Sequence, residues 1–472
     1  MDRDTLEKAL GHISDRHISD AAKLKRRRPY WMGAVAAATA AAILVLMFVF
    51  PGTPNTVDIP LPSGAIRMAA VPRGIDPPRK VDYETNEDFK TALTEWNNLQ
   101  LLRLQRTDEA LESLVPFLKN SAATFLSGSE NKLWSPVNAY VGLAMLAEMA
   151  GGGSRQQILD LFGVNSIEAL REQVAAVFES AYFNNGKEIS ALANSIWLRE
   201  GLVYDEAAIQ NLAHYYYASS FQGNLASDEM AQAIASWLNH NTGGLLSDYP
   251  PQKLSPLTVF ALYSTIYFQA QWRDKFPSNG TTGIFHAATG DKEVSYMHHK
   301  EYRTLYYWGE SFGAVALGLE NGSQMWFILP DEGKTPEDVL AEGAYMDMIL
   351  GERWANKQSH RVNMTVPKFD ISGKQDLIPG LKELGISDVF EPGSANFSSL
   401  TGDTPIFVDF VNQAVRVQID TEGVTGAAYI EIGTLETARP DGDVMDFVLD
   451  RPFLFVITAN NIPLFSGVVN IP

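Results

Sequence analysis

The chain contains no cysteine among its 472 residues. Disulfide bonds, thiolate metal sites and a cysteine nucleophile are therefore all excluded. Basic residues are also in the minority, because 37 lysines and arginines accompany 56 aspartates and glutamates and leave a formal net charge of -19. Since binding to phosphates requires a basic surface, we do not expect a nucleic-acid partner.

The sequence also lacks several short motifs of common catalytic sites. It has no G-x-x-x-x-G-K-[ST], no G-x-G-x-x-G and no H-E-x-x-H. The only adjacent histidines are His298 and His299, and neighbouring side chains point apart on a strand or helix, so no metal site is predicted. We expect neither an enzyme nor a cofactor.

One long run without charge is present, from Tyr30 to Phe50. At about 1.5 Å per residue it is long enough to cross roughly 30 Å of hydrocarbon. Lysines and arginines at 23, 25, 26, 27 and 28 precede it, so residues 1–29 are expected in the cytoplasm and the rest outside. We predict an uncleaved single-pass anchor at residues 30–50. The alternative is a cleaved signal peptide, but the basic region is long and no A-x-A site follows.

Residues 51–85 carry seven prolines and little periodicity, which predicts an extended tether on the outer side of the membrane. From residue 86 onward, helical and strand patterns alternate without a second linker. The stretch 258–272 places apolar residues on one face of a long strand, and two apolar strands surround the turn signal Ala459-Asn460-Asn461. Helices precede a mostly β C-terminal half, so the fold class is α+β. Length alone would favour about three domains.

The segment "DTEGVTGAAYIEIGTLETARPDGD", residues 420–443, combines a strand suited to a core with a loop suited to solvent. Small or apolar residues alternate at positions 424, 426, 428, 430 and 432, which is the period of one strand face. The run from Thr437 to Asp443 follows directly and has the composition of an exposed loop.

Several segments resemble the serpin family in the order that the family has them. They are "NKLWSPVNAYVGLAMLAEMAGGGSRQQILDLFG", "LANSIWL", "WLNHNTGGLL", "STIYFQAQWRDKF", "TVPKFDISGKQDLIPGLKELGISDVFEPGSANFSSL" and "DRPFLFVITANNIPLFSGVVNIP". The resemblance covers about residues 100–472 and suggests a bacterial, membrane-anchored inhibitor of serine proteases. It implies one domain at 86–472, with three β-sheets, about nine helices and an exposed reactive loop at about 422–446.

In serpins a protease cleaves this loop, and the freed segment then inserts into the central sheet as a new strand. The resemblance assigns the hinge of that movement to seven residues. They are Glu422, Gly423, Val424, Thr425, Gly426, Ala427 and Ala428. Val424 replaces a common threonine, but it brings no charge to the inserting face.

Family spacing places the cleaved bond about fourteen residues after Gly423, at Thr437 or Ala438, whereas counting back from Pro452 gives a position nearer Asp441. The resulting window also contains Arg439, whose bond to Pro440 is a poor one to cleave. A small residue at the cleaved bond predicts elastase-like or subtilisin-like targets.

The resemblance also assigns a sheet-opening region. It consists of Ser135, Pro136, Ser264, Trp272 and Asn412. Ser264 and Asn412 match an asparagine and a histidine that the family pairs, so a hydrogen bond between them is expected. The alternative for each of these residues is a plain packing role.

Two functions remain open at this stage. The first is a suicide inhibitor that forms a covalent acyl complex with a serine protease, and the second is a non-inhibitory serpin that serves as a surface binding or structural module. A monomer is expected in either case.

Overall fold

The computed structural model describes residues 65–67, 78, 80–83, 85–184, 188–245, 250–350, 354–402, 405–424 and 444–472. All of these residues fall within the unit formed by residues 53–472. None of the helices in these ranges is both long and apolar enough to span a membrane. The predicted cytoplasmic segment 1–29 and anchor 30–50 lie outside the described residues.

Part of the predicted tether is a strand. β1, Ala65–Arg67, pairs antiparallel with β5, Ala218–Gly223, and Ala65 lies opposite Phe221. A short 3-10 helix, η1, follows at Lys80–Asp82. The prediction of an extended tether over 51–85 is therefore wrong for these residues. Periodicity misses such a strand because three residues can join a sheet edge through backbone hydrogen bonds alone.

The described residues form ten α-helices, close to the number that the resemblance implies. Their N-caps include Thr85, Ser166, Asp205, Ser227 and Thr335, whose side-chain oxygens accept a backbone N–H in the first turn. The helices are α2 Asn86–Leu126, α3 Pro136–Met149, α4 Gly152–Leu161, α5 Ile167–Ala181, α6 Glu206–Tyr215, α7 Asp228–Asn241, α8 Pro336–Glu342, α9 Ala344–Leu350, α10 Ile378–Glu383 and α11 Ser398–Thr401. A second 3-10 helix, η2, spans Asp388–Phe390.

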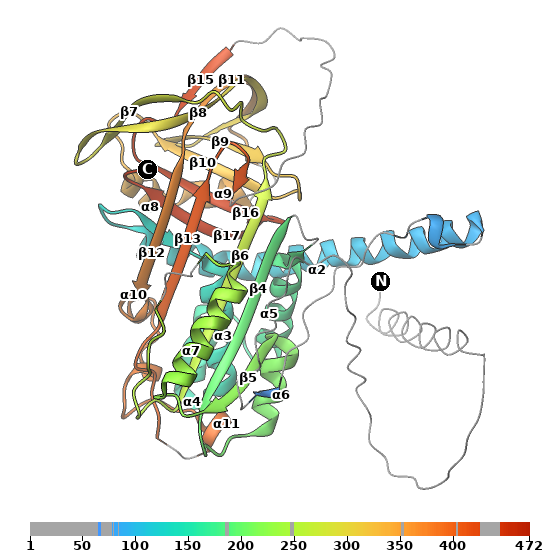
Figure 1. The fold of residues 1–472 in the computed structure, drawn as a ribbon, viewed down its shortest axis with the longest axis vertical. Helices are drawn as coiled ribbons and strands as arrows, with labels where there is room; N and C mark the ends of the chain where they lie inside the picture. The colour runs from blue at the N-terminus through green and yellow to red at the C-terminus, as the bar shows by residue number, and fades with distance from the viewer. Residues whose placement is uncertain are drawn as a thin grey trace. The chain divides into compact units, whose positions relative to one another are not determined.

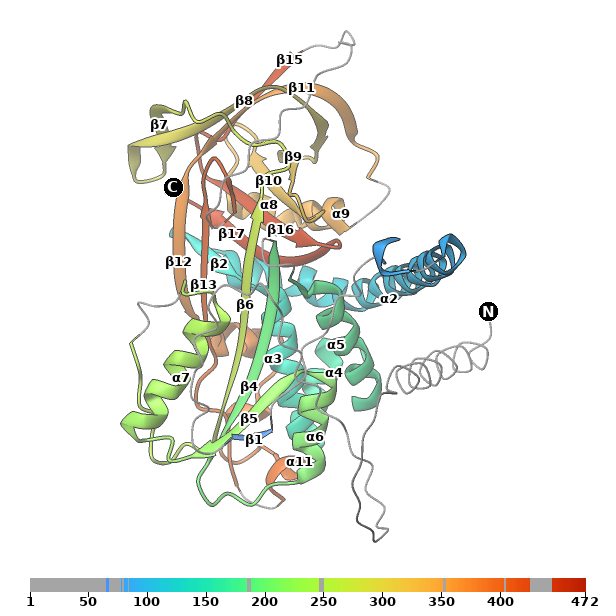
Figure 2. The same ribbon diagram turned by 45° about the vertical axis from the view of Figure 1, so that its right-hand side comes forward.

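The first sheet is long and has the order β1-β5-β4-β6-β14-β13-β12, with β3 paired to β4. Its remaining strands are β3 Phe183–Asn184, β4 Ile189–Arg199, β6 Phe260–Gln271, β12 Phe369–Asp376, β13 Asn412–Ile419 and β14 Gly423–Val424. The strand predicted at 258–272 is confirmed as β6. Alternate residues of β4 and β6 pack in two separate clusters, one containing α3 and the other containing α7, so these helices lie on opposite faces (Figures 1 and 2).

The second sheet has the order β15-β11-β8-β9-β10-β16-β17-β2, with β7 paired to β8. Its strands are β2 Lys132–Trp134, β7 Thr281–Ala287, β8 Gly290–Trp308, β9 Phe312–Gly318, β10 Gln324–Pro330, β11 Lys357–Pro367, β15 Val444–Val448, β16 Phe453–Ala459 and β17 Ile462–Val469. The resemblance implies three sheets, whereas the described strands form two continuous ones. The 19-residue β8 accounts for the difference, because it pairs with β7 and β11 and then, through its last three residues, with β9.

The hairpin of β16 and β17 lies at the centre of the core. Every residue of both strands is buried. The turn between them places Asn460 and Asn461 at φ of 49° and 62°, the left-handed conformation that a tight hairpin turn requires. The predicted turn is therefore confirmed, and the mixed content of helices and sheets confirms the α+β class.

A buried ionic network joins three helices. Glu148 of α3 is 2% exposed, and Arg171 of α5 donates two hydrogen bonds to its carboxylate, at 2.8 and 2.7 Å. The Asn211 amide and the Tyr216 hydroxyl also donate to this carboxylate, at 2.9 and 3.0 Å. Burial raises the pKa of the Tyr216 hydroxyl well above its usual value, so it remains a donor.

We expect Glu148→Ala to lower the free energy of unfolding by about 3–5 kcal/mol, because it leaves the Arg171 guanidinium without its buried partner. The matched control is Glu168→Ala, which removes an acid that is 72% exposed and lies 3.7 Å from the same arginine. The control should change stability little, since exposed ion pairs contribute little. Denaturant unfolding followed by circular dichroism measures both. Equal losses in the two variants would contradict a buried network.

Candidate functional site

The two-residue strand β14 is the only described link between the two halves of the first sheet. Val424 pairs with Ile419 of β13 and with Ala270 of β6, and Gly423 pairs with Gln271. Both pairings are antiparallel, so β6 and β13 run parallel to each other. Beyond Val424 no described strand lies between them. The two facing edges therefore offer backbone donors and acceptors to one further strand.

Residue 423 must be a glycine at this approach of two strands. A Cβ atom added to Gly423 would lie 2.3 Å from the Ala270 carbonyl oxygen and 2.8 Å from the Gln271 Cα. Both contacts are with backbone atoms, which have little freedom to move aside. The next residue, Val424, is only 2% exposed and belongs to the main core. The chain thus lies between the two strands at residues 423 and 424, with the valine side chain directed inward.

The chain just before β14 is held by Trp272, which follows β6. Its indole Nε1–H donates to the Asp420 carbonyl at 2.8 Å, and its backbone N–H donates to the Glu422 carbonyl at 3.0 Å. Asp420 Oδ1 accepts from the N–H groups of Glu422 and Gly423, at 2.8 and 3.2 Å. The Glu422 carboxylate forms an ion pair with Lys275 at 2.8 Å. These contacts fix the point at which the chain enters the sheet.

The Trp272 ring packs against a short chain of aromatic rings, Phe276 and then His299. Its ring meets Phe276 edge to face, with centroids 5.7 Å apart, and Phe276 meets the His299 ring in the same way at 6.0 Å. Burial lowers the pKa of His299, while the charge of Asp274 opposes this shift. Because the shift is downward from 6.5, the imidazole is neutral at pH 7 and the support for Trp272 carries no charge.

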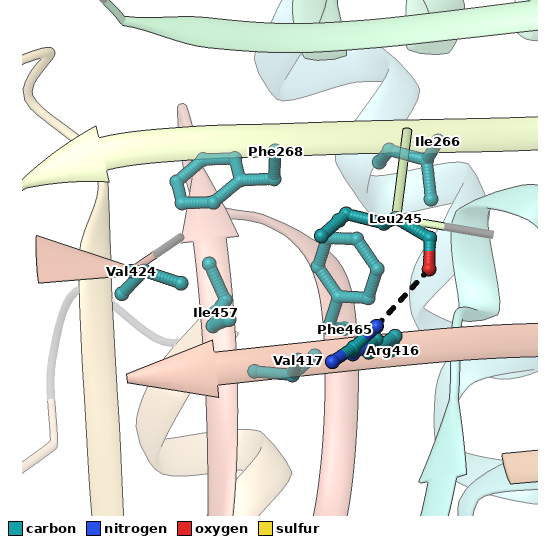
Figure 3. Close-up of a pocket in the computed structure, with 8 residues that line it drawn as sticks. All are labelled: Leu245, Ile266, Phe268, Arg416, Val417, Val424, Ile457 and Phe465. Carbon is teal, nitrogen blue, oxygen red and sulfur yellow. Dashed lines mark hydrogen bonds between the residues drawn. The ribbon is translucent and has the colours of Figure 1, made fainter. Parts of the chain in front are cut away.

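A small cleft continues from Val424 between β6 and β13 (Figure 3). Its lining is apolar apart from one arginine, and Figure 3 shows the side chains converging from β6, β13, β14, β16, β17 and the segment after α7. The lining residues are Leu245, Ile266, Phe268, Arg416, Val417, Val424, Ile457 and Phe465. Arg416 donates to the Leu245 carbonyl at 3.3 Å and makes two bonds to the Asp370 carboxylate, at 2.8 and 2.7 Å. An uncharged side chain that follows Val424 on the same face would enter this cleft.

The N-terminus of α3 contacts both of the parted strands. The Ser135 backbone N–H donates to Gln413 Oε1 and the Ser135 carbonyl accepts from Gln413 Nε2, both at 2.9 Å. Ser264 of β6 donates to Asn138 Oδ1 at 3.2 Å. Ser135 Oγ also donates to the Leu464 carbonyl of β17 at 2.7 Å. The first turn of α3 thus connects β13, β6 and the central hairpin.

A family model described as Serpin (serine protease inhibitor) matches residues 117–472, which is most of the chain. The chain belongs to the serpin family. Serpin-ZX of Arabidopsis thaliana is 27% identical over 376 residues, covering 75% of this chain and 95% of that protein. Alpha-1-antiproteinase 2 of Equus caballus is 29% identical over 357 residues, covering 73% and 82%. The native structure of the thermophilic serpin tengpin has a TM-score of 0.68 at 24% identity, covering 77% of this chain and 94% of that one.

Three of the seven predicted hinge residues lie among the described residues. Glu422, Gly423 and Val424 form the entry point between β6 and β13, and Trp272 contacts it directly. Ser135 and Pro136 are the N-cap and first residue of α3. The remaining hinge residues Thr425, Gly426, Ala427 and Ala428, and the reactive-bond window Thr437, Ala438 and Arg439, lie outside the described residues.

The structure does not pair Asn412 with Ser264. Asn412 is exposed at the start of β13, and Ser264 bonds to Asn138 instead. Gln413 is buried and occupies the position opposite Ser135. The error is one residue, which is enough to move a side chain to the other face of a strand. The alternation of buried Gln413, Val415, Val417 and Ile419 would have revealed the inward register.

We expect Gln413→Ala to destabilise the native state by about 1–3 kcal/mol, because it leaves the buried Ser135 N–H and carbonyl without their partner. Asn412→Ala, one residue earlier, is the matched control and should have little effect. Thermal unfolding of both variants, followed by near-ultraviolet circular dichroism, provides the measurement. A larger loss for Asn412→Ala would restore the original assignment.

Proposed function

We propose that this serpin inhibits serine proteases as a suicide substrate, by inserting its cleaved reactive loop between β6 and β13. The observation that carries this proposal is β14, which already occupies the first two positions of the gap with Val424 directed into the core. Similarity to Alpha-1-antiproteinase 2, a protein named for protease inhibition, also supports it. The loop acts as bait, and the protein itself has no catalytic role.

The proposed reaction uses the chemistry of the protease. The protease serine attacks the carbonyl of the reactive bond, the C–N bond breaks, and the new amine takes the proton from the catalytic histidine. An ester then links the serpin to the protease. Insertion must carry the protease away before water hydrolyses that ester. A native fold held by a kinetic barrier supplies the driving force for this step.

The alternating residues after Val424 fit the gap. If the strand continues with its period of two, positions 426, 428, 430 and 432 follow Val424 inward, and these are Gly, Ala, Ile and Ile. Their burial contributes about 25 cal/mol per Å² of apolar area. Each inserted residue also finds hydrogen-bond partners on β6 and β13. Insertion therefore meets no charge on the inward face.

The targets that we propose are elastase-like or subtilisin-like enzymes. Thr437 and Ala438 present small side chains, which suit the small specificity pockets of such proteases. Arg439 would suit a trypsin-like pocket, but Pro440 follows it and lacks the backbone N–H of an ordinary peptide bond.

We expect the full chain to form a complex with elastase or subtilisin that survives heat and detergent on a denaturing gel. Mass spectrometry of the C-terminal fragment released from the complex should show a first residue of Ala438 or Arg439, which follow the proposed cleavage sites. A fragment that begins at Pro440 would instead identify Arg439 as the bait.

Two valine substitutions test whether insertion is required. Val424→Arg puts a charge on the buried face and should convert the protein into a substrate that is cleaved without forming a complex. Val203→Arg makes the same change at a residue that is 85% exposed, and should leave complex formation intact. Cleavage of the parent protein without any complex would favour the non-inhibitory role as a binding or structural module.

We further propose that residues 30–50 anchor the inhibitor in a membrane, with residues 1–29 in the cytoplasm and the serpin domain outside. The uncharged run and the basic residues before it support this orientation. In a bacterial host the chain should remain with the membranes after high-salt and alkaline washes, and removal of residues 1–50 should release it. Release of the unaltered chain with a new N-terminus after residue 50 would indicate a cleaved signal peptide.

A further inference from the structure

Two arginines lie directly opposite each other on the second sheet. Arg303 of β8 and Arg361 of β11 are register partners in an antiparallel ladder, so their side chains project from the same face. Like charges directly opposite each other destabilise a sheet. The chain has many more acids than bases, yet two bases meet here. A stability role does not explain this pair.

An unusual backbone segment supplies an acid to only one of the two arginines. A β-bulge interrupts the ladder between Val362 and Met364, and within it Glu301 has a φ of 51°. This left-handed conformation is strained for a residue with a side chain. The Glu301 N–H donates to Asn363 Oδ1 at 3.1 Å, and its carboxylate accepts from Arg361 at 3.2 Å.

The other nearby acid is also occupied. Asp446 of β15 accepts a hydrogen bond from Asn363 Nδ2 at 2.8 Å. Arg303 is exposed and forms no ion pair with any residue that the structure describes. Among the described residues of this face, the Glu301 carboxylate is paired with Arg361 and the Asp446 carboxylate is bound to Asn363, which leaves the Arg303 guanidinium exposed to solvent.

Exposed apolar side chains lie beside this charge. Leu305 follows Arg303 on the same face of β8 and is 39% exposed. Val444 is the parallel register partner of Arg361 and is 43% exposed. Figures 1 and 2 show β15, β11 and β8 side by side. We call Arg303, Leu305, Arg361 and Val444 the Arg303 patch. Arginine with exposed apolar side chains is a composition typical of binding surfaces.

The patch lies where the reactive loop rejoins the sheet. Val444 is the next described residue after Val424, and the reactive-bond window ends five residues before it, at Arg439. Five extended residues span at most about 18 Å. A protease seated on the loop is therefore within reach of the patch, because a typical interface covers about 800 Å² on each partner.

We propose that the Arg303 patch is a docking surface for the target protease, and that it selects proteases with acidic side chains beside the active-site cleft. The proposal rests on the proposed function, since it takes the inhibited protease as the partner. A charged surface of this kind increases the association rate and leaves the later chemistry unchanged.

The test compares the full-length parent protein with two charge reversals on β8. Arg303→Glu alters the patch, and Lys292→Glu makes the same change in net charge near the opposite end of the strand, where it pairs with β7. Two subtilisin-like proteases are used, one with an acidic surface and one with a basic surface. The second-order rate constant for loop cleavage, with or without a stable complex, is measured at about 50 mM and 500 mM salt.

With the acidic protease at low salt, Arg303→Glu should lower the rate constant about five- to tenfold, and high salt should remove most of the difference. The ratio of complex to cleaved product should not change. The melting temperature should not fall, because the substitution removes a like-charge pair. With the basic protease the rate constant should not fall.

An unchanged rate constant for Arg303→Glu would overturn the docking surface, as would an equal loss in Lys292→Glu. If the parent protein is cleaved without forming a complex, the proposed inhibition fails. The rate constant for cleavage still tests the patch in that case, so the two failures can be distinguished.

Discussion

The constraint on which this structure depends is that β6 and β13 are joined through β14 at one point and are separated beyond it. Two parallel strands in the middle of a sheet lie apart, and among the residues that the structure describes only Gly423 and Val424 bridge them. Parallel neighbours are normally paired along their length, because unpaired backbone groups in a sheet interior are costly. The gap between β6 and β13 is therefore a position at which one further strand can pair. The cleft below Val424 shows that its floor is apolar and matches what a strand of small residues would bury.

Contacts at both ends of the gap keep this arrangement in place. At one end, Trp272 and Lys275 bind the entering chain through its carbonyls and through Glu422. Further along, the first turn of α3 binds Gln413 on one strand through Ser135 and Ser264 on the other through Asn138. A helix N-terminus suits this role because its free N–H groups can donate hydrogen bonds to side chains without disturbing the helix. A few specific polar contacts thus fix the separation of the two strands.

The sequence predicts the elements better than it predicts their pairing. The strand at 258–272 and the turn at Asn460 were expected because periodicity and turn chemistry are local properties. The contact between Gln413 and Ser135 was not expected, because the residues that face inward on a strand depend on its register. β1 was missed because three residues carry no periodic signal. No sequence pattern indicates a role for Arg303. Its position opposite Arg361 depends on the pairing of β8 with β11.

The buried hairpin of β16 and β17 has a consequence for how the molecule is made. These strands follow every other described strand in the chain, yet β17 pairs with β2, more than 300 residues earlier, and Ile457 and Phe465 form part of the cleft between β6 and β13. During synthesis, the long sheet cannot complete its core before β16 and β17 have been translated. The nascent chain therefore exposes unpaired strand edges for most of its translation, and ribosome speed and chaperone binding become determinants of how much native protein is obtained.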